Sequence, residues 1–444
     1  MTEFQGLLLV PSRTGCMWAP GRFGVQNGRI QGLELGTATA SIKSAKSVES
    51  MRHFAPGLID LHVHGFGGWG PVGPMDEFRE RGEGEHSSLE RMAAALARAG
   101  TTAFLPTLFP EAPAALNQTV QRTWRDAVKV NQATHAHRPR GAQVLGLHLE
   151  GPFVNPMAAG ALPLVDLAEP SVAALRTLLA GVDAAAIRTL TLAPELAGAT
   201  DLVRELTTMG LRVSFGHSRA QAADVRALLQ RYPSTAFGIT HLFNAMSGVH
   251  HREPGLAHLA LCDDSVYAEM IGDLVHVGRE GFELALRARG PEHLCLVSDA
   301  LAGAGTGCDV FHSHGRKHVI RGGAAYYPGS VPPAHGVSQN TAQGSDGLHR
   351  TDPKCAQQAS GDQLAGSATG QWEAIQRLVG QGIVALADAL TMATLAPARA
   401  LQLESERGVL IEGAVADVLE IDTSGKRPRL SEVWIAGQPI GVQA

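Results

Sequence analysis

Two histidines stand at alternate positions at the end of an apolar run, in the segment PGLIDLHVHGFGG at residues 56–68. Side chains two positions apart on a strand face the same side, so His62 and His64 can hold one metal ion together. A chain with 19 histidines also contains such pairs by chance. The pair alone leaves two interpretations open: metal ligands, or two polar residues where a strand meets a loop.

Further imidazole and carboxylate groups end other apolar runs of the same kind. Histidine nitrogens with a carboxylate and an open position are the ligand set of a catalytic zinc. A carboxylate left free beside such a set is suited to accept a proton. The residues that end these runs are His148, Glu150, His217, His241 and Asp299. Five candidate ligands and one candidate base at run ends predict a single metal-dependent active site.

The elements that must position these residues are strands that alternate with helices. From about residue 83 onward, short β-branched runs alternate with Ala/Leu/Arg-rich stretches of helical period, which is typical of βαβ units. The expected strands cover residues 57–64, 101–107, 144–151, 187–195, 211–218, 235–243, 266–273 and 294–300. The expected helices cover residues 88–98, 114–133, 171–179, 199–209, 220–230 and 278–289.

This order of elements predicts the α/β class and a (β/α)₈ barrel of the TIM type. Eight strand–helix repeats in roughly 250 residues match the size of that fold. A doubly wound open sheet would show the same periodicity. The barrel is favoured because its strands deliver their carboxyl ends to one mouth, and the candidate residues stand at those ends.

The two flanks of the chain have a different pattern. Residues 1–54 and 398–444 contain short apolar pieces separated by turn residues. Turn candidates such as Asn27-Gly28 and Gly437-Gln438 predict β-hairpins. We expect the two ends to form one small β-sandwich beside a barrel domain at residues 55–397.

A Gly-, Ser-, His- and Pro-rich segment interrupts the barrel pattern at about residues 303–363. Having no clear period, it is predicted to be a long loop or insertion. Its histidines are expected to be solvated rather than to bind metal; they are His312, His314, His318, His335 and His349.

The bulk composition limits the classes of partner. The chain has 444 residues, 44% of them apolar and 18% charged, as in ordinary globular proteins. A net charge of −5 provides no broad positive field for nucleic acid or an anionic membrane, so neither is expected as a partner. The amino-terminal segment lacks a secretory pattern and no run is long enough to span a bilayer.

Cysteine usage also points to a reducing compartment. The five cysteines are scattered and form neither CxxC pairs nor a dense framework. They are Cys16, Cys262, Cys295, Cys308 and Cys355. We therefore expect a cytoplasmic protein.

The order HxH, Glu, His, His, Asp resembles that of the amidohydrolase superfamily. Within it, the chain is similar to the N-acetylglucosamine-6-phosphate deacetylases. The resembling segments cover nearly the whole chain; they are PGLIDLHVHGFGG (56–68), LGLHLEGPFVNP (145–156), SFGHS (214–218), THLFNAMSGVHHREPG (240–255), LVSDALAGAG (296–305) and LAGS (364–367).

The resemblance implies a role for each candidate residue. The principal divalent metal, expected to be zinc, would be held by Glu150, His217 and His241. His62 and His64 would hold a second ion with Glu150 as the bridge, giving one or two ions per chain. Many amidohydrolases use a carboxylated lysine at the end of strand four as the bridge, and this chain reads LAPE there.

The implied reaction removes the acetyl group from N-acetylglucosamine 6-phosphate, giving glucosamine 6-phosphate and acetate. Asp299 would accept a proton from the attacking water and deliver it to the sugar nitrogen. Arg252 would pair with the phosphate, because a guanidinium presents paired donors to an oxyanion. The resemblance further implies a homodimer and these other substrate contacts: Asn244, the Ala245 backbone, His276 and Leu364.

The chain departs from the family pattern after the GPF segment. A Lys-Gly-Ala-His type stretch with a substrate-contacting histidine is usual there, whereas this chain has Ala159 and Leu162 at the lysine and histidine positions. The sugar, the acyl group and the need for phosphate therefore stay open.

Two other classes of function are alternatives. One is an amidohydrolase that acts on another N-acetylated amino sugar, on a cyclic amide or on an amino acid derivative. The other is a non-catalytic relative that keeps the barrel for binding or assembly, which the complete set of ligands and Asp299 disfavours.

Overall fold

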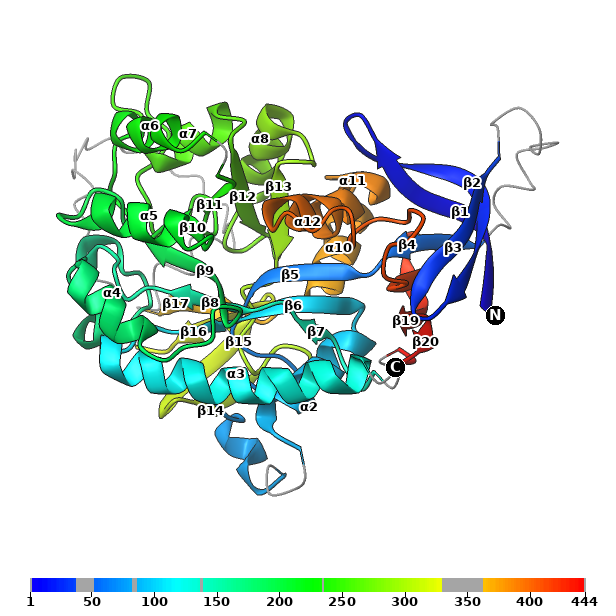
Figure 1. Ribbon diagram of the computed structural model, residues 1–444, viewed down its shortest axis with the longest axis horizontal. Helices are drawn as coiled ribbons and strands as arrows, with labels where there is room; N and C mark the ends of the chain where they lie inside the picture. Colours follow the sequence, from blue (N-terminus) through cyan, green and yellow to red (C-terminus); the bar gives the residue numbers. More distant parts are fainter. Residues whose placement is uncertain are drawn as a thin grey trace, which may run out of the picture.

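The computed structural model describes residues 2–36, 52–81, 86–135, 139–233, 235–329 and 362–442. A barrel of strands and helices occupies one part of the molecule, and strands from both ends of the chain lie together beside it (Figure 1). This arrangement confirms the predicted fold class.

Eight parallel strands form the barrel, in the spatial order in which they occur along the chain. Asp299 N–H donates to the His62 carbonyl (2.8 Å) and His64 N–H to the Ala300 carbonyl (2.9 Å), so the last strand returns to the first. An open sheet is thereby excluded. The strands are β5 (Leu58–Val63), β6 (Thr101–Leu108), β8 (Leu147–Glu150), β9 (Ile187–Leu192), β10 (Arg212–Phe215), β11 (Phe237–Ile239), β12 (Val266–Ile271) and β13 (Leu294–Val297), with the short β7 (Gln143–Val144) paired to β6.

Six helices lie where the helical period predicts them. They are α2 (Ser88–Arg98), α3 (Pro113–His135), α4 (Val172–Leu179), α5 (Ala199–Thr208), α6 (Ala222–Arg231) and α8 (Arg279–Arg289). The start of α2 shows the local cause: Ser87 accepts a hydrogen bond from Glu90 N–H, and the Glu90 side chain accepts one from Ser87 N–H. This capping box satisfies two amide groups that a helix end leaves free.

Among the residues that the structure describes, four further helices were not predicted: α7 (Leu256–Cys262), α10 (Gln371–Gly380), α11 (Leu386–Ala393) and α12 (Leu395–Ala400). In α12, five of the six residues are buried, so the sequence shows no polar face. Without a contrast between a polar and an apolar face, the sequence of a short helix shows no clear hydrophobic period. Single turns of 3₁₀ helix complete the chain at Asp76–Arg81, Pro156–Ala158 and Leu164–Asp166.

Strands from both chain ends form one seven-stranded sheet, in the order β20-β19-β18-β4-β1-β2-β3. Its members are β1 (Thr2–Ser12), β2 (Gly15–Gln26), β3 (Arg29–Leu35), β4 (His53–Pro56), β18 (Val418–Asp422), β19 (Arg429–Ile435) and β20 (Gln438–Pro439). Because β5 follows β4 after one residue, the barrel strands begin beside this sheet and run away from it (Figure 1). The carboxyl ends of the strands therefore face away from the sheet.

The hairpin turns of this sheet show how much the turn signals specify. Asn27 and Gly28 have φ values of 52° and 75°, as the predicted turn requires. The second turn uses Ala436 and Gly437, with φ of 48° and 73°, and so lies one residue before the predicted Gly437-Gln438.

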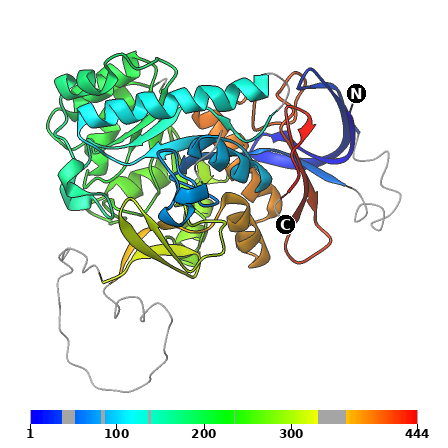
Figure 2. The same cartoon turned by 90° about the horizontal axis from the view of Figure 1, so that it is seen from below.

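A third sheet lies beside the barrel (Figure 2). It consists of β14 (Val310–Ser313), β15 (Arg316–Arg321), β16 (Ala324–Tyr327) and β17 (Gln363–Ser367), in that order. Residues 310–327 are therefore two hairpins, where the sequence predicted a loop or insertion without elements. Strand β17 fixes this sheet to the barrel mouth, because Ser367 N–H donates to the Asp299 carbonyl at 2.9 Å.

The histidines of this segment do not all behave as predicted. His318 is buried and stacks on Phe311 with ring centroids 4.4 Å apart, so it is not solvated. His312 is exposed and pairs with Glu77 at 2.7 Å. His335 and His349 lie outside the described residues.

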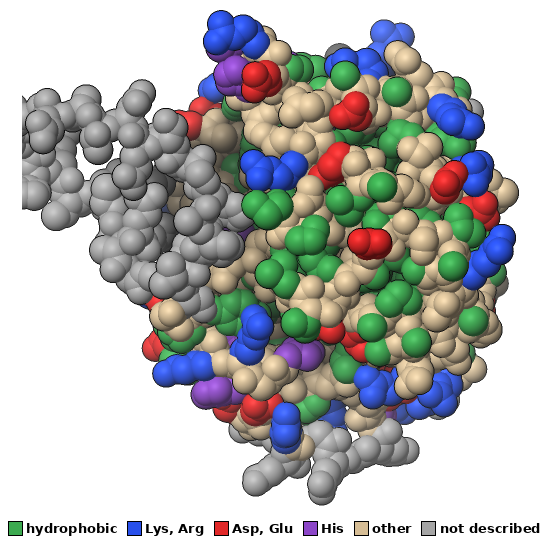
Figure 3. Space-filling view, turned by 90° about the vertical axis from the view of Figure 1, so that its left-hand side faces the viewer, with side chains coloured by type: hydrophobic (Ala, Val, Ile, Leu, Met, Phe, Trp, Pro, Cys, Tyr) green, Lys and Arg blue, Asp and Glu red, His purple; other side chains and the backbone are tan. Residues whose placement is uncertain are grey.

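The outer surface carries charges of both signs. On the face seen in Figure 3, the Lys/Arg and Asp/Glu side chains are interspersed among apolar and neutral atoms. Within the described ranges, no helix is both long and apolar enough to cross a membrane.

Candidate metal centre and substrate cavity

Glu150, His217 and His241 meet at one point of the barrel mouth. Glu150 Oε1 lies 3.0 Å from His217 Nε2 and 3.1 Å from His241 Nε2, and the two Nε2 atoms are 3.0 Å apart. All three residues are buried. They come from β8, from the second residue after β10 and from the second residue after β11. We call these three residues the Glu150 group.

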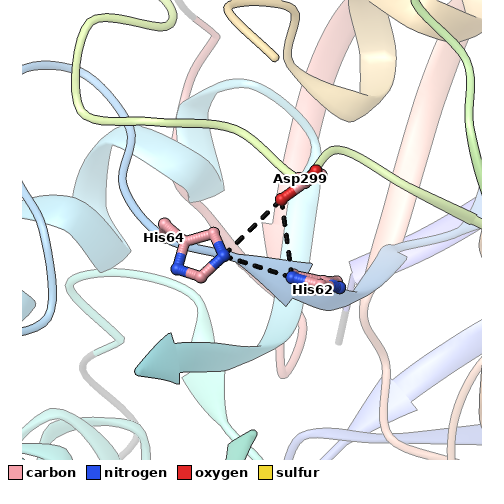
Figure 4. A group of neighbouring side chains, drawn as sticks. All are labelled: His62, His64 and Asp299. Atoms are coloured by element: carbon pink, nitrogen blue, oxygen red, sulfur yellow. Dashed lines mark hydrogen bonds and ion pairs between the residues drawn. The ribbon is translucent and has the colours of Figure 1, made fainter. Parts of the chain in front are cut away.

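His62, His64 and Asp299 form a second group, shown in Figure 4. His62 Nε2 lies 3.2 Å from His64 Nε2 and 3.4 Å from Asp299 Oδ1. His64 Nε2 lies 3.6 Å from the same oxygen. We call these residues the His62 group.

Glu150 connects the two groups. Its Oε2 lies 3.2 Å from His64 Nε2, and its Oε1 lies 3.6 Å from His62 Nε2. The carboxylate at the end of strand four, Glu195, does not lie between the groups, because it accepts hydrogen bonds from Ser218 Oγ at 2.7 Å and Asn155 Nδ2 at 2.8 Å. Glu150 is the carboxylate that lies between the two sets of histidines.

The backbone at the strand ends is held in an uncommon conformation. His217, His241 and Asp299 each follow a strand by two residues, and their φ values are 46°, 32° and 47°. Left-handed backbone at non-glycine residues costs roughly 1–3 kcal/mol and is concentrated at functional sites. The left-handed turn re-aims each side chain at the barrel mouth, where an extended strand would continue past it.

The hydrogen bonds behind the imidazoles orient two of them as ligands. His62 Nδ1 lies 3.1 Å from Glu269 Oε2, and His217 Nδ1 lies 3.0 Å from the Ala158 carbonyl. A hydrogen on Nδ1 donated to these acceptors leaves the Nε2 lone pair directed at the group. Burial lowers the pKa of His62 well below its usual value, so this ring is neutral, the form that binds metal.

The electrostatics of the two carboxylates differ. Burial alone would raise the pKa of Glu150, but the imidazoles of His62, His217 and His241 packed against it hold that pKa well below its usual range. Burial, followed by the negative charge of Glu150, raises the pKa of Asp299 well above its usual range. A cation between the groups would oppose both causes at Asp299 and favour its ionised form.

The donor set fits a divalent metal ion. Four histidine nitrogens and carboxylate oxygens converge in two buried groups, without a protein cation among them to neutralise Glu150. Nitrogen atoms that face one another at 3.0–3.2 Å are suited to share an electrophile. The Glu150 group is the stronger candidate site, because all three of its donors lie within 3.1 Å of one another.

A cavity of about 160 Å³ adjoins these groups. The predicted substrate residues Asn244, Ala245, His276 and Leu364 line it, together with Asp299. Arg252 does not line it; it lies exposed in the segment that follows Asn244 and Ala245. We call this space the catalytic cavity.

His276 carries a charge suited to an anionic ligand. Burial alone would lower the pKa of His276, but its 2.7 Å contact with Asp273 raises it above the usual value. Asp273 is bonded to Nδ1, which leaves Nε2–H as the free donor. The raised pKa favours the protonated form of His276, which lines the catalytic cavity beside the candidate metal ligands.

Two residues of the site were not identified from the sequence. Glu269 orients His62, and its signal was an acidic residue inside the apolar strand VYAEMIGD. Tyr327 lines the catalytic cavity from β16, and nothing in the sequence pattern connects that strand with the barrel. His148, which ends the same strand as Glu150, is bonded to Thr191 Oγ1 (2.8 Å) and the Leu61 carbonyl instead.

Comparison with known proteins supports this geometry. The model of the amidohydrolase family matches residues 54–311. The N-acetylgalactosamine-6-phosphate deacetylase of Escherichia coli O157:H7 is 31% identical over 86% of this chain and 86% of its own length. The human N-acetylglucosamine-6-phosphate deacetylase is 32% identical over 84% of this chain and 80% of its own length.

Solved structures show the same fold. The N-acetylglucosamine-6-phosphate deacetylase of Thermotoga maritima superimposes with a TM-score of 0.75 at 20% identity and full coverage of both chains. A variant of the Mycobacterium smegmatis enzyme, solved in complex with N-acetyl-D-glucosamine 6-phosphate, gives a TM-score of 0.71 at 24% identity, covering 99% of this chain and 100% of its own.

Proposed function

The chain belongs to the amidohydrolase family, within its N-acetylglucosamine-6-phosphate deacetylase branch, and we propose that it deacetylates N-acetylglucosamine 6-phosphate. As a member of this family, it is a hydrolase of carbon–nitrogen bonds. The products are glucosamine 6-phosphate and acetate. The observation that carries the proposal is the convergence of the Glu150 group, Asp299 and the substrate residues on one cavity.

A divalent ion would be held by Glu150, His217 and His241. We propose zinc, because two imidazoles and a carboxylate are donors that zinc prefers. When bound, such an ion supplies Lewis acidity to the attacking water and the amide carbonyl. His62 and His64 offer a second position that shares Glu150, so the chain would bind one or two ions.

Asp299 moves the proton. Its ionised carboxylate accepts the proton of the water that attacks the acetamide carbonyl. The same carboxyl group then donates this proton to the sugar nitrogen as the carbon–nitrogen bond breaks. Asp299 lines the catalytic cavity beside Glu150 and His241, so one carboxyl group reaches both the attacking and the leaving atom.

The sugar would lie against Asn244, the Ala245 backbone, His276 and Leu364. Its amide faces the metal ligands, and its phosphate, on the far carbon of the ring, points outward. Arg252 is exposed, so its guanidinium is accessible to that phosphate. His276, which lines the catalytic cavity with Asp299, would contact the sugar closer to its amide.

A second candidate substrate is N-acetylgalactosamine 6-phosphate. The chain is 31% identical to the E. coli N-acetylgalactosamine-6-phosphate deacetylase, which supports this candidate. This identity is close to the 32% identity to the human N-acetylglucosamine-6-phosphate deacetylase. The two substrates differ only in the configuration at one ring carbon, so the amide chemistry is identical.

The test is release of acetate from four compounds: the two acetylated sugar phosphates and the same two sugars without phosphate. We expect the highest kcat/KM on N-acetylglucosamine 6-phosphate. Asp299→Asn should lower kcat about 10³-fold while metal content is kept. Asp201→Asn, a charge-matched change on the exposed face of α5, should leave kcat unchanged. Wild-type protein that releases acetate from none of the four compounds would falsify the deacetylase proposal.

We also propose a homodimer in a reducing, cytoplasmic compartment. The described cysteines are free thiols, which supports the compartment; they are Cys16, Cys262, Cys295 and Cys308. Light scattering measures the molar mass of the assembly, and 46.7 kDa per chain makes a dimer easy to distinguish from a monomer.

A further inference from the structure

A second, larger cavity adjoins the catalytic cavity. Its volume is about 420 Å³, against about 160 Å³ for the catalytic cavity. The two share His64, Phe109, Ala161 and Tyr327 as lining residues. We call the larger space the side chamber. The candidate reaction centre therefore lies next to more empty volume than an acetyl group needs.

The walls of the side chamber are mainly apolar. Phe109 stacks on His64 with ring centroids 3.9 Å apart and planes at 5°, which places an aromatic surface directly beside a candidate metal ligand. Beyond it, the chamber is lined by Val72, Leu301 and Phe311. A cavity of about 150 Å³ with apolar walls is enough to hold benzene, so this chamber has room for a chain of six or more carbons.

The wall continues without a break into the catalytic cavity. Leu162 lines the catalytic cavity and Ala161 lines both spaces. Leu162 packs in an apolar cluster with Val154 and Ala159, against which Phe109 lies. Leu162 and Ala159 are the positions at which the sequence departs from the polar pattern of its relatives, so the departure removes polar groups from the passage into the chamber.

The charged groups of the chamber do not favour an anionic occupant. Glu111 and Asp166 contribute two carboxylates, and Arg316 contributes one cation, which lies over the Tyr327 ring at 4.9 Å. Burial lowers the pKa of His318 to about 4, so this imidazole is neutral at neutral pH. A neutral chain is the occupant that this lining suits.

The position of the chamber selects one part of the substrate. Asn244, Ala245 and His276, the expected sugar contacts, line the catalytic cavity only. His64 and Phe109 form the opposite boundary. An amide carbonyl placed between Asp299 and the Glu150 group thus has its nitrogen on the side of the sugar residues and its acyl carbon on the side of the chamber.

We propose that the side chamber is an acyl-chain subsite, and that this protein also hydrolyses N-acyl amino-sugar phosphates with uncharged linear acyl groups of about four to eight carbons. The inference rests on the proposed function, because it uses the same reaction. Water adds to the carbonyl carbon, the carbon–nitrogen bond breaks, the amine takes the proton from Asp299, and the product acid is a longer carboxylate instead of acetate.

The test compares glucosamine 6-phosphates that differ only in the N-acyl group: acetyl, butanoyl, hexanoyl and succinyl. Amine release gives kcat/KM for each. We expect the value to rise by up to about fourfold for each methylene that the chamber buries, and the succinyl compound to be at least tenfold worse than hexanoyl. If the acetyl compound is hydrolysed and kcat/KM for the hexanoyl compound is at least tenfold lower, the acyl-chain subsite is wrong. The proposed function then remains intact. Failure on every compound overturns the proposed function itself.

Two matched valine variants locate the effect. Val72 lines the side chamber and Val128 lies on α3 outside both cavities, and both are 38% exposed. Val72→Trp should lower the hexanoyl-to-acetyl ratio of kcat/KM about tenfold, whereas Val128→Trp should leave the ratio unchanged. Equal ratios in the two folded variants, checked by thermal melting, contradict the assignment of the chamber.

A further compound tests which end of the substrate enters the chamber. Hexyl N-acetylglucosaminide 6-phosphate carries the same six carbons on the anomeric oxygen. If Val72→Trp impairs this compound and spares the N-hexanoyl one, the chamber binds an aglycone and the acyl assignment is wrong. The acyl assignment predicts the reverse.

Discussion

The two candidate ligand groups at the barrel mouth differ in how they are built. In the Glu150 group, residues from three strands bring their donor atoms within 3.0–3.1 Å of one another. In the His62 group, two histidines of one strand lie 3.4 and 3.6 Å from Asp299 Oδ1. The tighter group is suited to hold an ion permanently. The looser group contains Asp299, the carboxyl group that we propose as the proton carrier.

This difference assigns separate tasks to neighbouring residues. A carboxylate fully engaged in metal binding is a poor proton acceptor, so Asp299 needs its longer distances. Glu150 takes part in both groups, since its Oε2 faces His64 and its Oε1 faces His217. Changes at Glu150 should therefore affect both groups, and changes at His62 or Glu269 should affect one.

The largest effect is expected for Glu150→Gln. The amide keeps the shape of the side chain but removes the charge that attracts a cation to either group. We expect metal content below one-tenth of an ion per chain and a loss of kcat/KM of at least about 10³-fold. Elemental analysis and the acetate assay measure both. Glu283→Gln, a matched change on the outer face of α8, should alter neither.

A smaller effect is expected for the double variant His62→Asn, His64→Asn. If the Glu150 group holds its ion independently, one ion per chain should remain while any second ion is lost. We expect a fall in kcat of about 10²-fold, since removal of a ligand or of its support typically costs affinity or activity on that scale. Metal content equal to that of the wild type would show that the pair serves hydrogen bonding alone.

The smallest effect on activity is expected for Glu269→Gln. Glu269 accepts from His62 Nδ1, and its other oxygen lies 3.6 Å from the buried Arg212. An amide can still accept the hydrogen bond, so we expect metal affinity to fall about tenfold in the His62 group only. The readout is competition for the metal with a chelator of known affinity.

Loss of stability must be separated from this positioning role. Removing one partner of a buried ion pair leaves an uncompensated charge and costs about 3–5 kcal/mol. Adding Arg212→Met to Glu269→Gln removes that charge, and should restore much of the stability in denaturant unfolding without restoring metal affinity. Recovery of both together would mean that Glu269 acts only through the fold.

The sequence specified most of the barrel because its signals are local. All eight strands were identified from β-branched runs, and α2 was predicted with both of its ends as observed. The largely buried α12 was missed because a helix without a polar face carries no periodic signal. The hairpins at residues 310–327 were missed although β14 pairs with β15 and β15 with β16 locally, because this Gly- and His-rich segment shows no clear period.

The same distinction between local sequence signals and long-range packing applies to the candidate site. The sequence by itself indicated that six candidate side chains would meet, because parallel barrel strands deliver their carboxyl ends to one mouth whatever the loops contain. These are Glu150, His217, His241, Asp299, His62 and His64, and the structure brings them together. Only the tertiary structure decided that Glu269 supports His62, that Arg252 lies outside the catalytic cavity and that a chamber opens beside His64. Those features depend on the packing of side chains from segments distant in the chain, and no local pattern encodes such contacts.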